Sequence, residues 1–113
     1  MIARGDIFWI ASEDPAVPYA HPHVVVQDDV LNASRIATTV VVALTSQLAS
    51  ASEPGNVLLD AGEGDLPQRS VAVVSRIMAV DKTRLGARIG ALSSARVDEI
   101  LDGLRFLQRS FLR

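Results

Sequence analysis

The sequence contains no cysteine, so it can form neither disulfides nor thiolate metal sites. It also lacks the unbroken apolar run of roughly 18 to 20 residues that a membrane-spanning helix needs. Residues 1–6 do not show the basic-then-apolar pattern of a secretory signal. We therefore expect a protein of the reducing cytoplasm that does not enter a membrane.

A strong positive charge is absent too. The formal net charge of −2 gives no general attraction to nucleic acid, so such binding would need a local basic surface. Acidic residues concentrate in the first half of the chain and basic residues in the second. With 113 residues, of which 49% are hydrophobic and 21% charged, the chain fits a single folded domain over residues 1–113.

Short apolar and β-branched segments dominate the first two thirds of the chain. Strands are predicted at residues 6–10, 24–27, 38–44, 56–60 and 71–74. Residues 77–80 are expected to continue the fifth strand after a bend near Arg76, whereas residues 82–90 fit either a helical turn or a short strand. The polar residues 28–37 are expected to form a loop. Parallel strands need long crossover connections, so these closely spaced strands predict a mostly antiparallel sheet.

One amphipathic helix is predicted at the end of the chain. Apolar residues from Val97 to Phe111 recur at helical spacing, and Ser93 or Ser94 is placed to cap the first turn. Arg105, Arg109 and Arg113 are placed to interact with the carbonyl end of the helix. The fold class is therefore mainly β, a small and strongly curved antiparallel sheet or barrel covered by a C-terminal helix.

The two histidines of the chain form its most plausible chemical centre. His21 and His23 flank Pro22 directly before an apolar run, which predicts a loop-to-strand junction. Histidine exchanges a proton near neutral pH, and functional groups often lie on loops held by a rigid sheet. Two ordinary surface histidines are the alternative. Because no cysteine or carboxylate at a recognised spacing completes a metal site, we expect no metal and no cofactor.

Five stretches resemble the MazF/PemK family of bacterial toxins, in the right order along nearly the whole chain. They are RGDIFWI at 4–10, HPHVVVQDD at 21–29, VVVALTSQ at 40–47, PGNVLLDAGEGDLPQRSVAVV at 54–74, and RIMAVDKTRLGARIGALS with RVDEIL at 76–101. The resemblance implies an SH3-like barrel of the CcdB/MazF type. It also implies the toxin of a type II toxin-antitoxin pair, a cytoplasmic endoribonuclease that cleaves single-stranded RNA at short sequences without metal.

The same resemblance implies three kinds of partner besides the RNA substrate. Family members form two-fold homodimers. A cognate antitoxin would cover the RNA groove with an acidic, partly disordered tail. The toxin-antitoxin complex would bind its own promoter DNA.

The resemblance also implies the site residues, with departures. The family usually has Arg-Pro where this chain has His21 and Pro22, and a threonine or serine where it has Thr45, and this arginine and threonine are taken to carry cleavage. We expect His21 and Thr45 to be catalytic, with His21 as general base or acid. Substrate binding is expected of Ser46, Gln47, Arg76, His23 and Arg35. A glutamine often found in relatives is replaced by Arg76.

Two other functions remain open at this point. Arginine binds phosphate through two parallel hydrogen bonds, which a neutral histidine cannot reproduce. The chain could therefore be a catalytically inactive homologue that binds antitoxin and DNA as a co-regulator. A topoisomerase poison of the CcdB type is the least favoured of the three functions, because residues 108–113 lack the tryptophan and glycine that such proteins present.

Overall fold

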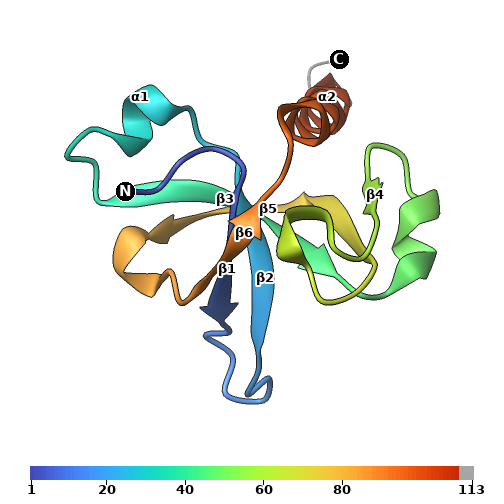
Figure 1. Ribbon diagram of the computed structural model, residues 1–113, viewed down its shortest axis with the longest axis horizontal. Coiled ribbons are helices and arrows are strands. Elements are labelled where there is room, and N and C mark those ends of the chain that lie inside the picture. The colour runs from blue at the N-terminus through green and yellow to red at the C-terminus, as the bar shows by residue number, and fades with distance from the viewer. Residues whose placement is uncertain (110–113) are drawn as a thin grey trace.

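Within residues 1–109, which the computed structural model describes, six strands form one antiparallel sheet in the order β4-β5-β3-β2-β1-β6 (Figure 1). The strands are β1 (Asp6–Ala11), β2 (Ala20–Val25), β3 (Thr38–Thr45), β4 (Val57–Leu59), β5 (Ser70–Asp81) and β6 (Arg88–Ala91). The α-helices are α1 (Asp29–Asn32) and α2 (Ser94–Arg109), and the 3-10 segments are η1 (Leu48–Ser52), η2 (Glu63–Asp65) and η3 (Lys82–Arg84). The mainly β fold class with a C-terminal helix is confirmed.

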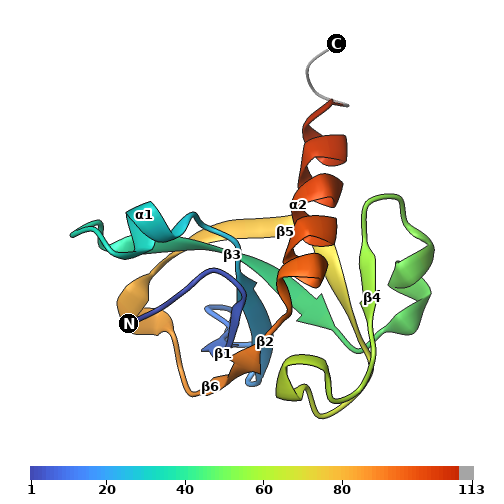
Figure 2. The same ribbon diagram turned by 45° about the horizontal axis from the view of Figure 1, so that its top comes forward.

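The sheet bends sharply in the middle of β5. Val42 of β3 pairs with Ile77, but Leu44 pairs with Ala72, so residues 73–76 stand opposite the single residue Ala43. Extra residues on one strand bend it and increase its twist. Figure 2 shows the resulting curl of the sheet beneath α2. The predicted bend near Arg76, with one strand continuing on both sides of it, is confirmed.

Alternate residues of the central strands enter two separate cores, as the two-residue period of a strand requires. On one face, Ile7, Val24 and Val42 belong to the larger core, which α2 completes with Val97, Ile100 and Leu104. On the other face, Phe8, Ile10, Val25, Val41 and Val80 form a smaller core.

Helix α2 begins where the sequence predicts. The Oγ of Ser93 accepts a hydrogen bond from the backbone N of Arg96 at 3.3 Å, so Ser93 is the cap. The Arg96 guanidinium donates to both carboxylate oxygens of Glu63, at 2.8 and 3.0 Å, and so ties the helix to η2. Phe111 and Arg113, which were predicted to extend the helix, lie outside the described residues.

Three sequence predictions need correction. Strand β2 starts at Ala20 and ends at Val25, so the two histidines lie within a strand and not before it. Pro22 is tolerated because β3 pairs with β2 only from His23 onward, which leaves Pro22 with a single neighbouring strand. The fourth strand is shorter than predicted, Val57–Leu59. The expected loop at 28–37 contains α1, whose first turn is capped by Asp28.

The undecided segment 82–90 contains both structures that its sequence allowed. Residues Lys82–Arg84 form the short helical turn η3, and β6 follows and pairs with β1. No helix in the described part of the chain has the length and apolar character that a bilayer span requires.

Candidate functional site

Strand register gathers the predicted catalytic groups on one face of the sheet. His21 and His23 are two residues apart in β2, so both side chains leave the same face. His23 pairs with Ala43 of β3, and Thr45 lies two residues beyond Ala43. Both imidazoles and the threonine hydroxyl therefore belong to the face that carries the smaller core.

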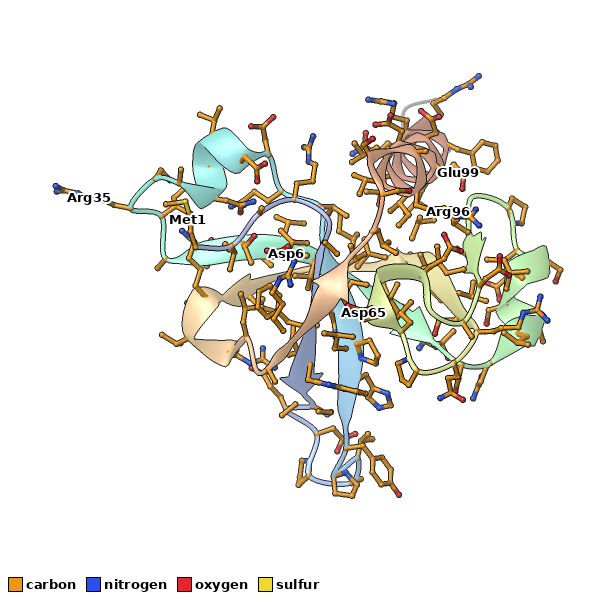
Figure 3. All side chains as sticks on the ribbon, in the orientation of Figure 1. Met1, Asp6, Arg35, Asp65, Arg96 and Glu99 are labelled. Atoms are coloured by element: carbon orange, nitrogen blue, oxygen red, sulfur yellow. The ribbon has the colours of Figure 1, made fainter. Side chains whose placement is uncertain are left out.

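A cavity of about 560 Å³ opens on this face, a volume typical of ligand sites. Of the predicted site residues, five line it: His21, His23, Thr45, Gln47 and Arg76. Ser46 is exposed next to Thr45 but does not line the cavity. Arg35 is also outside the lining, because it lies at the outer edge of the α1–β3 connection (Figure 3).

The two imidazoles have different surroundings. His23 is only 7% exposed, and its Nδ1 lies 2.8 Å from the backbone oxygen of His21. Burial is the main reason that the pKa of His23 is lowered, although the hydrogen bond to the His21 carbonyl acts against it. His21 is exposed and makes an edge-to-face contact with Tyr19, with 6.4 Å between the ring centroids.

Thr45 ends β3 and begins the turn that leads to η1. Its Oγ1 accepts a hydrogen bond from the backbone N of Gln47 at 3.2 Å, which is a common turn arrangement. A hydroxyl that accepts one hydrogen bond still has its own hydrogen to donate. Thr45 can therefore serve the turn and donate to an oxyanion in the cavity at the same time.

Two cations from different elements line the cavity. The exposed guanidinium of Arg76, at the bend of β5, forms no ion pair with any residue in 1–109. Arg84 of η3 donates to the Ala11 backbone oxygen at 3.0 Å and lies 3.0 Å from Glu13 Oε1. Glu13 and Asp14, on the loop after β1, also line the cavity.

Sequence reasoning missed Arg84 as a site residue. The sequence of residues 82–90 fits either a helical turn or a short strand, so it does not define where the Arg84 side chain lies. Across the described ranges, no group of three or more histidine, aspartate or glutamate side chains is arranged to hold a metal ion.

Comparisons with known proteins agree with this fold. A family model described as "PemK-like, MazF-like toxin of type II toxin-antitoxin system" matches residues 3–107. Endoribonuclease MazF6 of Mycobacterium tuberculosis is 37% identical over 108 residues, 93% of this chain and 95% of that protein. Endoribonuclease EndoA of Bacillus subtilis is 29% identical over 111 residues, 93% and 92% of the two chains.

Solved structures share the architecture at lower sequence identity. A mycobacterial endoribonuclease in complex with its cognate antitoxin superposes with a TM-score of 0.77 at 20% identity, covering 96% of this chain and 95% of that chain. The Mycobacterium tuberculosis toxin MazF-mt6 superposes with a TM-score of 0.76 at 18% identity, covering 92% and 96%. At these identities the superpositions show a common fold.

Proposed function

This chain belongs to the family of PemK-like, MazF-like toxins of type II toxin-antitoxin systems, and on that premise we propose that it is a metal-independent endoribonuclease cutting single-stranded RNA at short sequences. Two curated relatives that cover nearly the whole chain are named endoribonucleases. The observation that carries the proposal is the single cavity shared by two imidazoles, the Thr45 hydroxyl and the unpaired guanidinium of Arg76.

These groups match the requirements of RNA cleavage without metal. The 2′-hydroxyl must lose a proton, the charge on the pentavalent phosphorus must be stabilised, and the departing 5′-oxygen must gain a proton. In the proposed site His21 moves a proton, Thr45 donates to a phosphate oxygen, and Arg76 supplies positive charge. His23, Gln47 and the adjacent Ser46 contact the substrate, and Arg35 would reach only nucleotides outside the cavity.

The proposed partners follow from the family. We expect a homodimer whose RNA groove is covered by an acidic segment of a cognate antitoxin, in a complex that binds promoter DNA. A solved neighbour is titled as a complex with its cognate antitoxin, which supports this expectation. Arg76, which forms no ion pair with any residue in 1–109, gives an acidic segment a counter-charge at the cavity. A toxin acting on mRNA would work in the cytoplasm.

The test uses the purified protein, long single-stranded RNA and EDTA. Wild type is compared with His21→Gln, Thr45→Val and the control Arg105→Gln, which alters an exposed residue of α2 far from the cavity. We expect cuts at defined sequences that persist in EDTA and in the control and fall at least about 100-fold in both site variants. Absence of cutting by wild type, together with tight antitoxin binding, would instead identify an inactive co-regulator, an alternative raised by histidine replacing the family arginine.

A further inference from the structure

We propose that His23 is the general base of the cleavage reaction and that His21 is its acid partner, an inference that rests on the proposed function. The two imidazoles leave the same face of β2, two residues and roughly 7 Å apart along the strand. In-line displacement at phosphorus places the attacking and leaving oxygens on opposite sides. Two imidazoles at this spacing can reach both oxygens of one phosphate.

The fold determines which nitrogen of His23 carries its proton. Within residues 1–109, the hydrogen-bond partner of Nδ1 is the backbone oxygen of His21, 2.8 Å away, and a carbonyl oxygen can only accept. Nδ1 must therefore carry a hydrogen. In the neutral ring Nε2 then has a free lone pair, which is the form that a general base requires.

The free nitrogen of His23 is accessible from the cavity. Among residues 1–109, no fully buried side-chain nitrogen or oxygen lacks a hydrogen-bond partner. Nε2 of His23 makes no hydrogen bond in that range, so it must be reachable by solvent, and His23 lines the cavity. The rest of the ring is buried, which holds the base in one orientation.

Burial and the charges of His21 and Arg84 favour a neutral His23. The ring faces His21 on its own strand, Arg84 from η3, Arg76 from β5, and Glu13 and Asp14 from the loop after β1. Burial lowers the pKa of His23, and the charges of His21 and Arg84 lower it further against the opposing hydrogen bond. The neutral form of His23, which a general base requires, is therefore favoured.

The proposed step conserves atoms and protons. His23 Nε2 takes the proton of the ribose 2′-hydroxyl while the 2′-oxygen forms a bond to phosphorus. The bond from phosphorus to the 5′-oxygen breaks, and the leaving oxygen takes the proton of the His21 imidazolium. The products are a 2′,3′-cyclic phosphate and a 5′-hydroxyl. His23 ends the step protonated and His21 ends it neutral, so the number of protons is conserved.

The experiment uses a short RNA containing a mapped cut site, and the same RNA with a 2′-deoxyribose at the cut nucleotide. In His23→Asn the side-chain amide lies near the position of Nδ1 and can still donate to the His21 carbonyl. In His23→Gln the amide lies near the position of Nε2. Both variants therefore keep a polar group in the site. We expect both variants to keep thermal stability near wild type and to lose about 100- to 10,000-fold in kcat, with a much smaller change in KM from the altered substrate contact. The deoxy substrate should remain uncut.

Two further readouts separate a base from a merely structural histidine. The acidic limb of the wild-type kcat/KM profile should lie below the ordinary histidine pKa of about 6.5 and disappear in His23→Gln. Nitrogen NMR of the two histidines should show His23 as the Nδ1–H tautomer. Cutting by wild type with unchanged kcat in both His23 variants, or an Nε2–H tautomer, would overturn this inference alone. Absence of cutting by wild type would overturn the proposed function as well.

Discussion

Helix α2 and the loop before β4 approach so closely that a single methyl group should separate them. A Cβ built on Gly103 would overlap the backbone oxygen of Gly55 and lie 3.0 Å from its carbonyl carbon and 3.1 Å from Val74 Cγ1. Gly103 is in the middle of α2, where alanine would normally be the better residue. The substitution Gly103→Ala therefore sets helix propensity against packing.

The sizes of the two effects decide whether Gly103→Ala stabilises or destabilises the fold. Replacing glycine by alanine inside a helix gains about 1 kcal/mol of stability. Overpacking typically costs about 1 to 3 kcal/mol. Here the main obstacle is a backbone carbonyl, which cannot rotate away as a side chain can, so we take a cost of about 3 kcal/mol. The net expectation for Gly103→Ala is a loss of about 2 kcal/mol in the free energy of unfolding.

Urea unfolding followed by circular dichroism measures this loss. The matched variant Gly62→Ala has open space around the new methyl but a φ of +89°, so it should lose about 1 to 2 kcal/mol through backbone strain alone. Gln108→Ala, at an exposed position of the same helix, should change stability by less than about 0.5 kcal/mol. A Gly103→Ala protein as stable as wild type would refute the packing argument.

Three further predictions concern charge and buried polarity. Arg84→Gln should weaken binding of an RNA analogue that cannot be cut. If this guanidinium contacts one phosphate, the slope of log Kd against log salt concentration should become shallower by about 0.7, which titrations at several salt concentrations would measure. The pKa of Glu63 is lowered because Arg96 donates hydrogen bonds to its carboxylate. At pH values above the ordinary pKa of 4.5 the ionised Glu63 therefore stabilises the fold, and this stabilisation is lost as the pH falls through the lowered pKa. Urea unfolding of wild type and Glu63→Gln should accordingly differ at pH 7 and converge at pH 2. Thr39→Val removes the buried hydrogen bond to Asn32 Oδ1 at 2.8 Å and should cost about 1 kcal/mol, measured as a lower Tm.

The sequence was sufficient to predict elements whose pattern is local. Residues 38–44 are β-branched almost throughout, and the period of apolar residues from Val97 onward is helical, so β3 and α2 were found in nearly their observed positions. The bend near Arg76 was also predictable, because polar residues interrupt an otherwise apolar strand there. The shift that produces it is visible only in the pairing with β3.

Tertiary contacts decided the elements that the sequence left open. Residues 82–90 carry no clear period, and β6 forms because β1 offers it an edge to pair with. This pairing brings η3 near the cavity, so the role of Arg84 there depends on a contact between distant parts of the chain. The short helix α1 depends on a side-chain cap and a buried asparagine, signals that a polar segment does not distinguish from a loop.

The different environments of the two histidines also come from strand pairing and not from the motif. In the sequence, His21 and His23 stand symmetrically on either side of Pro22. Strand β3 pairs with β2 only at His23–Val25, so His23 is enclosed between two strands opposite the small side chain of Ala43. Within the described sheet, His21 has β1 as its only neighbouring strand and stays exposed. The end of one strand pairing thus gives a symmetric motif one buried and one solvent-exposed imidazole, which is the asymmetry that the proposed acid and base pair requires.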